Sequence, residues 1–448
     1  MPAEMQAELT DTERQVLGSA WGSDLGWEFL TELIEIGNRM GGHPGEHEAA
    51  TLVADHLRAA GARDVTVDSF AMTRWNRGTT DLAVTTPVDR SFEAIALPYS
   101  PAGDIEGALV DVGAGTPEEI DDADVEGKIA LASSSTPEDY GRFIHRMEKY
   151  GHAAEAGAIG FIFHNHVPGQ LPPTGSLQFN QEGSIPGIGV SKETGHWLLE
   201  YADRGGTVAL TVEASVEPAE SYNAHGVVGP DTDEEVVIVA HHDAHDIAEG
   251  GLDNGSGIAT AVAAAQLLGE FELQAQVRIA GVGSEEIGLI GADQLAATLD
   301  LDRVKAVLNL DGAGRFRDMT PVVNGSDPLA EAFAAVSEAV GHPIETDDRT
   351  HPFSDHWPFV RRGVPATQVR SDSGERGRGW GHTHADTRDK ADRRNLQEHA
   401  MLIALTAKEL AARDPLPRLD SETVADALRE GDLEEGMRAA GIWPDDWN

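Results

Sequence analysis

Residues 241–257 read HHDAHDIAEGGLDNGSG, so three histidines and three aspartates lie within thirteen residues before the chain turns to glycine and serine. Imidazole nitrogens and carboxylate oxygens are ligands that Zn²⁺, Co²⁺ and Mn²⁺ accept in proteins. A solvated loop has no need of so many imidazoles beside so many carboxylates. The stretch therefore raises the hypothesis of a metal site, and the fold must then bring any further ligands to it.

The elements around this stretch predict where such ligands would meet. Apolar segments at 234–240, 276–282, 304–310 and 364–369 are typical of buried strands. Helical patterns separate them at 256–268, 287–299, 328–340 and 395–412. This alternation predicts an α/β fold, with a mostly parallel mixed sheet covered by helices on both faces. In such sheets ligands bind at the carboxyl ends of the strands.

The acidic and histidine residues of interest follow those strands. Each of the four strands is followed, directly or after a short loop, by histidine or carboxylate residues, and one further carboxylate precedes the helix at 256–268. In chain order these residues are His241, Asp243, Asp253, Glu285, Glu286, Asp311 and His382. Taken singly, Asp253 has the alternative role of a helix N-cap and Asp311 that of a turn former. Their convergence at one edge of one sheet favours a shared site.

The rest of the chain divides into regions that differ in composition and in predicted secondary structure. Residues 24–40 and 47–60 predict amphipathic helices, and 64–70 and 80–86 predict strands. From about residue 100 the chain is rich in Gly and Pro, with short strand signals around helices at 145–156 and 191–204. We interpret residues 1–98 as the first part of a catalytic domain, 99–217 as a β-rich insert, 218–415 as the main catalytic part and 416–448 as an acidic helical tail.

Composition limits the setting and the partners. The 448 residues include 77 acidic and 33 basic side chains, a formal charge of −44, and no cysteine. Disulfides and thiolate metal sites are therefore excluded. The charge argues against nucleic acid and anionic membranes as partners and favours a halophilic protein of a salt-rich cytoplasm. No signal peptide and no apolar run of membrane-spanning length is evident. The oligomeric state, a homodimer or higher, stays open.

Several short sequence motifs together resemble those of a known family. AHHD, GLDNGSG, SEEIGLIGA, NLDGAG, SDHWPF with GVPA, and HTHADT occur in the order and spacing of the M28 co-catalytic two-zinc exopeptidases. The insert, with EGKIALAS, AAEAGAIGFIFHN and IPGIGVSKETG, resembles a protease-associated (PA) domain. The resemblance implies a phosphorylase/hydrolase-like fold of the zinc-exopeptidase type and a pair of divalent ions, with Zn²⁺ favoured and Co²⁺ or Mn²⁺ as alternatives.

The resemblance also implies a role for each residue. Glu285 would be the general base and acid, and Asp243 would lie behind the site and orient it. Asp253 would bridge both ions, with two further ligands for each ion, namely His241 with Asp311 and Glu286 with His382. The last of the family's motifs is commonly His-Thr-Pro-x-Asp-Thr, whereas this chain has HTHADT. Register favours His382 over His384, and the choice stays open at this point.

Other residues are candidates for the substrate pocket. His356, in SDHWPF, is expected to flank it, and Arg376 and Arg378, in RSDSGERGRGWG, could hold a substrate carboxylate. His242 and His245 are expected in the pocket wall or at the surface, without a defined role.

The favoured function is hydrolysis of peptide bonds by a water bridged between two metal ions, in an aminopeptidase that acts on small peptides. A metallocarboxypeptidase would use the same metals, with Arg376 or Arg378 reading the substrate's terminal carboxylate. A glutaminyl cyclase-like enzyme would use one zinc ion. A non-catalytic binding protein on this fold is the remaining alternative, although such relatives typically lose ligands. The expected partner is a peptide substrate.

Overall fold

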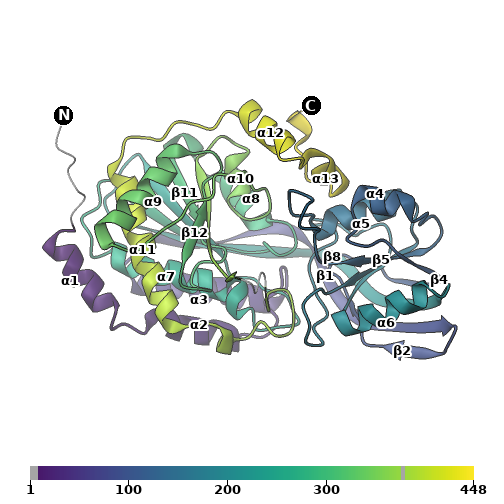
Figure 1. The fold of residues 1–448 in the computed structure, drawn as a ribbon. Coiled ribbons are helices and arrows are strands. Elements are labelled where there is room, and N and C mark those ends of the chain that lie inside the picture. The colour runs from purple at the N-terminus through teal and green to yellow at the C-terminus, as the bar shows by residue number, and fades with distance from the viewer. Residues whose placement is uncertain (1–8, 375–378, 448) are drawn as a thin grey trace.

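A mixed sheet built on four parallel strands forms the centre of the structure, a computed structural model that describes residues 9–374 and 379–447 (Figure 1). The parallel strands lie in the order β13 (Ala366–Ser371), β11 (Val304–Asn309), β9 (Glu235–His241) and β10 (Gln276–Val282). The antiparallel strands β12 (Met319–Val322) and β8 (Thr207–Val228) flank them. The predicted mostly parallel mixed sheet is confirmed.

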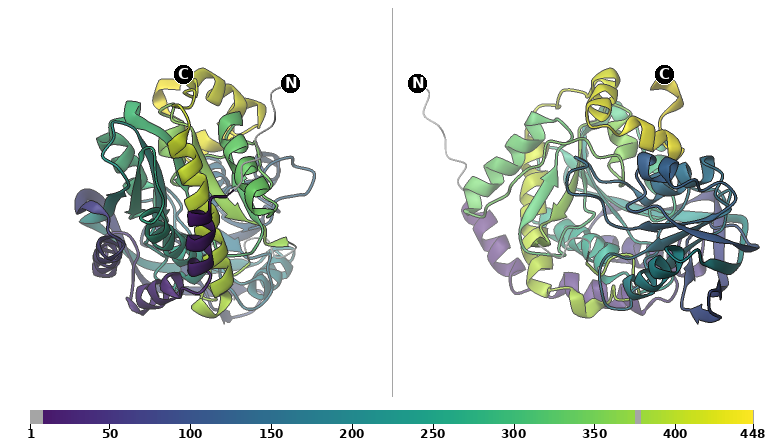
Figure 2. Two further views of the ribbon diagram at one scale, coloured as in Figure 1. Left: turned by 90° about the vertical axis from the view of Figure 1, so that its left-hand side faces the viewer. Right: turned by 45° about the vertical axis from the view of Figure 1, so that its right-hand side comes forward.

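Both faces of this sheet are buried because its strands are apolar on both sides. Along β9, Val236 and Ile238 join one core cluster and Val237 and Val239 join another, as the alternation of a strand requires. The first cluster is covered by α2 (Leu25–Glu35), α3 (Pro44–Ala59), α7 (Ser256–Leu268), α9 (Asp327–Val340) and α11 (Arg393–Ala412). The second is covered by α8 (Ile290–Thr298), α10 (Trp357–Val360) and the C-terminal helices (Figure 2).

One long ribbon differs from the prediction. Residues 64–70 and 80–86 were expected to form two separate strands, but β1 (Arg63–Thr86) is a single strand that pairs with β8 along most of its length. The segment between the two predicted strands lacks regular apolar alternation, and its pairing with β8 supplies the backbone hydrogen bonds instead. β1 and β8 run from the main sheet into the inserted region (Figure 1).

The inserted region continues the same sheet. Its strands β4 (Gly103–Asp111), β5 (Ile129–Ser133), β6 (Gly160–His164) and β7 (Gly187–Val190) are parallel, and β4 joins β8. The short strands β2 (Arg90–Phe92) and β3 (Ile95–Ala96) lie at its edges. Helices α4 (Pro117–Asp122), α5 (Arg146–Glu155) and α6 (Lys192–Ala202) complete it.

The chain's two ends carry the remaining helices. α1 (Asp11–Ala20) packs near α11, and the predicted helical tail forms α12 (Ser421–Glu430) and α13 (Glu434–Ala439). The tail spans two regions, because Leu428 and Met437 join the second core cluster while α13 lies against α5 of the insert. Among the described residues no helix is long and apolar enough to cross a membrane.

Candidate active site and metal centre

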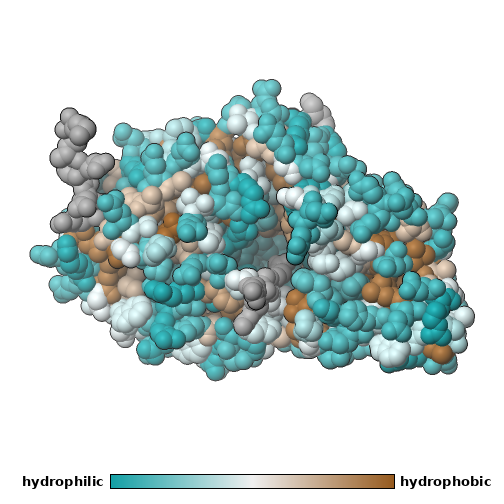
Figure 3. All heavy atoms as spheres, in the orientation of Figure 1, coloured by the Kyte–Doolittle hydropathy of each residue, from teal (hydrophilic) through white to brown (hydrophobic). Residues whose placement is uncertain are grey.

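A cavity of about 820 Å³ lies where the parallel strands end. Its floor includes Asp253, Glu285, Glu286, Asp311 and His382, the acidic and histidine residues that the sequence placed at the strand ends. Its walls come from the insert (141–146), a loop at 347–353 and the C-terminal tail (427–433). Figure 3 shows the hollow in the middle of this face, surrounded mainly by hydrophilic residues. The structure thus brings the predicted residues together from distant parts of the chain.

The first group of ligand atoms is centred on His241, which follows the last buried residues of β9. His241 is fully buried, and its Nδ1 donates to the carbonyl oxygen of Asp243 at 3.2 Å. That hydrogen bond selects the tautomer in which Nε2 carries the lone pair. Nε2 lies 3.6 Å from Asp253 Oδ1. Potential ligand atoms of His241, Glu285 and Asp311 all lie within 4.8 Å of one another.

The second group contains Glu286 and His382. His382 Nδ1 donates to the carbonyl oxygen of Thr174 at 3.3 Å, so Nε2 is again the nitrogen that can bind a metal. Nε2 lies 3.0 Å from Glu286 Oε2 and 3.3 Å from Asp253 Oδ2. His245 is the third member of this group, with its Nε2 2.9 Å from Glu286 Oε2.

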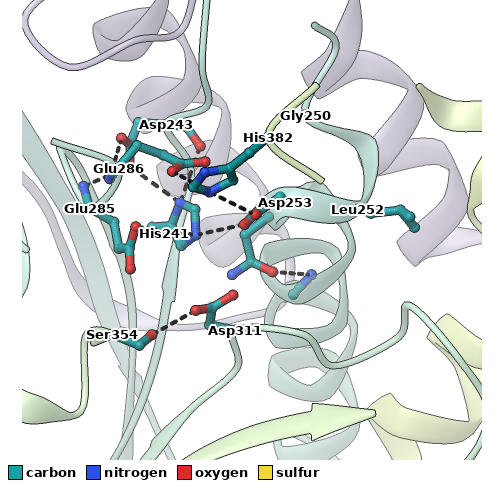
Figure 4. A network of polar contacts seen from close by, with 12 residues as sticks. His241, Asp243, Gly250, Leu252, Asp253, Glu285, Glu286, Asp311, Ser354 and His382 are labelled. Atoms are coloured by element: carbon teal, nitrogen blue, oxygen red, sulfur yellow. Dashed lines mark hydrogen bonds and ion pairs between the residues drawn. The ribbon is translucent and has the colours of Figure 1, made fainter. Parts of the chain in front are cut away.

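Asp253 stands between the two groups. Its Oδ1 faces His241 and its Oδ2 faces His382 (Figure 4). A carboxylate in that arrangement can bridge two ions. Backbone contacts fix it, because the amides of Leu252 and Asp253 donate to the two carboxylate oxygens of Asp386 at 2.7 and 2.9 Å. The Asp253–Asn254 peptide bond is cis, and the Asn254 side chain donates to the carbonyl oxygen of Leu310.

Asp243 holds the turn that carries the two glutamates. Its carboxylate accepts hydrogen bonds from the backbone amides of Glu285 and Glu286, at 3.0 and 3.3 Å, and its Oδ1 lies 3.4 Å from His241 Nδ1. Asp243 is fully buried and does not line the cavity. It therefore orients residues that face the cavity.

Glu285 is the group best placed to move a proton. It lines the cavity, and its Oε2 lies 4.0 Å from His241 Nε2. Burial, reinforced by the carboxylates of Asp355 and Asp311 and opposed by His241, raises the pKa of Glu285 well above its ordinary value. In the metal-free chain this carboxyl therefore favours its protonated form, and its position in the cavity beside His241 is what suits it to proton transfer.

The donor set fits divalent cations. Buried His241 Nε2 and Glu286 Oε1 have no hydrogen-bond partner among the described residues, although a buried polar atom without one is costly. Imidazole and carboxylate with no thiolate are the donors that Zn²⁺, Co²⁺ and Mn²⁺ share. A bound ion would satisfy these atoms, and the two groups of ligands would each hold one.

The sequence did not identify Arg315. Its Nη2 lies 2.8 Å from both Asp253 Oδ1 and Asp311 Oδ1, between the two carboxylates. This guanidinium outweighs the effect of burial and, with His241 and His382, holds the pKa of Asp253 well below its ordinary value. The only signal was its place four residues after Asp311, which is too weak to select it. His245 was noticed, but it lies beside Glu286 and is not at the surface.

The structure separates the two histidines of HTHADT. His382 faces the cavity within 3.0 Å of Glu286, whereas the His384 side chain is exposed. The predicted substrate-binding residue His356 does not line the cavity. It is fully buried and its Nε2 donates to the carbonyl oxygen of His351, which does line it. His351 therefore takes the place that was expected for His356. Arg376 and Arg378 lie outside the described residues.

Two protein-family models match segments of the chain. Residues 223–407 match peptidase family M28, and residues 105–198 match the PA domain, within the expected insert. The candidate site thus lies within the segment that is similar to peptidase family M28. The chain is 26% identical over 431 residues to aminopeptidase YwaD of Bacillus subtilis, covering 93% of this chain and 90% of that protein.

Solved structures share the fold. The peptidase M28 precursor from Shewanella amazonensis has a TM-score of 0.77 at 23% identity, covering 90% of this chain and 98% of that one. BSAP, a zinc aminopeptidase from Bacillus subtilis, has a TM-score of 0.69 at 24% identity, covering 89% and 98%.

Proposed function

We propose that this chain is a metal-dependent aminopeptidase that uses two divalent ions, with Zn²⁺ favoured, to remove N-terminal residues from small peptides. The observation that carries the proposal is the position of Asp253, whose two carboxylate oxygens face His241 and His382 in two separate ligand groups. Peptidase activity is supported by the similarity of residues 223–407 to peptidase family M28. The aminopeptidase polarity is supported by the names of the relatives, which include YwaD and BSAP.

The positions of the residues suggest which of them would hold each ion. His241 and Asp311 would hold one ion, Glu286 and His382 the other, and Asp253 would bridge the two. When bound, such a pair of ions polarises the scissile carbonyl and lowers the pKa of water.

Glu285 would accept a proton from the attacking water and then deliver it to the leaving amine, which balances the hydrolysis. Its carboxyl lines the cavity beside His241, where it would hold that proton between the two steps. Asp243 would keep Glu285 and Glu286 in place through their backbone amides. The cavity walls would exclude bulk water from the reacting carbonyl.

Substrate panels test the polarity. We expect cleavage of dipeptides with a blocked C-terminus and none of dipeptides with a blocked N-terminus, in assays with added Zn²⁺, Co²⁺ or Mn²⁺. The opposite pattern would make the chain a carboxypeptidase. A glutaminyl cyclase-like enzyme would bind one ion and cyclise glutaminyl peptides, and a non-catalytic binding protein would turn over neither panel.

Glu285→Gln tests the mechanism. The amide keeps the size of the side chain but cannot take up a proton, so kcat should fall by about 10²–10⁴-fold while two ions still bind. Glu430→Gln is the matched control, because Glu430 lines the same cavity at its rim and is exposed to solvent. Its kcat should stay within about twofold. Near-normal kcat for Glu285→Gln would refute the assignment.

The cellular setting is a separate proposal. The excess of 77 acidic over 33 basic residues suits a protein that works in a salt-rich cytoplasm, where salt screens its self-repulsion. Activity and stability that rise with KCl concentration, together with recovery of the protein in the cytoplasmic fraction, would support it. Activity that is highest in dilute buffer would contradict it.

A further inference from the structure

His245 lies in the same buried cluster as Glu286 and His382. It belongs to the loop that follows β9, and only 5% of the residue is exposed. Its Nε2 lies 2.9 Å from Glu286 Oε2, and its ring centroid lies 4.6 Å from that of His382, with the rings nearly perpendicular. The family resemblance gave His245 no role.

The contact between His245 and Glu286 is close but is not an aligned hydrogen bond. Neither ring nitrogen of His245 has a hydrogen-bond partner among the described residues, despite the 2.9 Å separation. An N–H directed at the carboxylate would meet the angular criterion at that distance. The nitrogen and the oxygen therefore lie close enough to share one ion, without an aligned hydrogen bond between them.

His382 completes this geometry. Its Nε2 lies 3.0 Å from the same oxygen of Glu286, and the potential ligand atoms of His245, Glu286 and His382 all lie within 4.8 Å of one another. Asp253 Oδ2 is 3.3 Å from His382 Nε2. Three donor atoms from three segments therefore surround one small region, and Asp253 lies beside it. The plainer interpretation is that His245 donates to Glu286 and only orients it, and the variants below distinguish that role from ligation.

We propose that His245 is a direct ligand of the metal ion held by Glu286 and His382. The inference rests on the proposed two-ion site, and it gives the two ions different numbers of protein ligands. One ion would have two imidazoles, Glu286 and the shared Asp253, whereas the other would have one imidazole, Asp311 and Asp253. Metal sites that are filled by four protein ligands are closed, while catalytic sites keep an open position. The open position would then lie beside His241, Asp311 and Glu285.

Zinc titration of the full-length, metal-free chain tests this. Wild type should bind two equivalents in two steps, a tight one and a weaker one. His245→Gln keeps an N–H that can donate to Glu286 but lacks the imidazole ligand. We expect it to weaken the tight step by about 100-fold or more, beyond the range seen when a residue behind a ligand is lost, and to leave the weaker step unchanged.

Two controls separate ligation from packing. His242→Gln removes an equally buried histidine of the same loop that belongs to neither ligand group, and its zinc affinities should match those of wild type. In His245→Ala, added imidazole should restore the tight step, because it can fill the space and supply the missing nitrogen. Wild-type-like affinities for His245→Gln, or no rescue of His245→Ala, would overturn the proposal.

A measurement on the wild-type protein tests the same ligand without requiring that any variant folds. X-ray absorption of protein loaded with one equivalent of zinc should show two imidazoles on the ion, and a single imidazole would overturn the inference. The outcomes also distinguish the two proposals. Wild type that binds two ions and hydrolyses peptides, but gives an unaltered His245→Gln variant, refutes only the role of His245. Wild type that binds no zinc refutes the proposed function itself.

Discussion

The buried carboxyl of Glu46 gives a prediction about how stability depends on pH. Glu46 lies on α3, fully buried, and accepts hydrogen bonds from the Gly42 amide at 2.7 Å and from the hydroxyls of Ser221 and Ser284 at 2.6 and 3.0 Å. Burial, with the charge of Asp243, raises the pKa of Glu46 from 4.5 to about 8 in the metal-free chain. The folded protein therefore favours the protonated acid.

The sign and size of the effect follow from linkage. Because the pKa is raised on folding, the stability contribution is fully present below pH 4.5 and is lost as the pH rises through about 8. Each pKa unit corresponds to about 1.4 kcal/mol, so ionisation costs the folded state roughly 3 kcal/mol at pH 7 and roughly 5 kcal/mol well above pH 8. Glu46→Gln mimics the protonated acid and avoids this cost.

Urea unfolding at about pH 5, 7 and 9 measures the difference in unfolding free energy between wild type and Glu46→Gln. Fixed ionic strength keeps the screening of the chain's other charges constant. A chelator is needed throughout, because cations bound beside Asp243 would lower the pKa of Glu46. We expect the variant to gain stability relative to wild type as the pH rises. A difference that stays constant within about 1 kcal/mol across this range would refute the reasoning.

Further outcomes concern the ligands and the tail. Asp386→Asn leaves one acceptor oxygen for the amides of Leu252 and Asp253, so zinc affinity should fall by about 10–100-fold in calorimetric titration. His382→Ala should lose one zinc ion on dialysis, whereas His384→Ala should retain both. Equal metal contents in the two variants would contradict the choice of His382 over His384 as the ligand. Leu428→Ala, in a fully buried position of α12, should lower the unfolding free energy by about 2–5 kcal/mol, and a loss under about 1 kcal/mol would show that the tail docks only weakly.

The sequence predicts the catalytic sheet well because the signals are local. Residues 234–240, 276–282 and 304–310 are continuous apolar runs that correspond closely to β9, β10 and β11, and each is followed within a few residues by histidine or carboxylate side chains. Parallel strands expose those ends at one edge of the sheet, so the meeting of His241 with Glu285 follows from the strand pattern alone.

The rest depends on contacts that no local pattern encodes. β1 is one strand because β8, more than a hundred residues away, pairs with it. His242 and His245 look equivalent in the sequence, yet of the two His245 is the one whose side chain lies against Glu286. Arg315 matters only because the fold places Asp253 and Asp311 on either side of it.

The same long-range contacts set the shape of the cavity. β1 and β8 extend the main sheet into the insert, and Arg77 of β1 pairs with Asp246, in the loop after β9, at 2.6 Å. Across the cavity, His145 of the insert stacks on Phe353 with ring centroids 4.5 Å apart. The tail closes a third side, where Gly436 meets Glu148 of α5 so closely that any added side chain would collide with its carboxylate.

These contacts join the insert to the main sheet and to the tail at several points. The residues proposed for the chemistry lie on the strand ends of the main sheet. Two of the three cavity walls, residues 141–146 and 427–433, lie outside the segment that matches family M28, and the third, the loop at 347–353, lies within it. Changes in the two outer walls would alter the space for a peptide while His241, Asp253 and Glu285 stay in place.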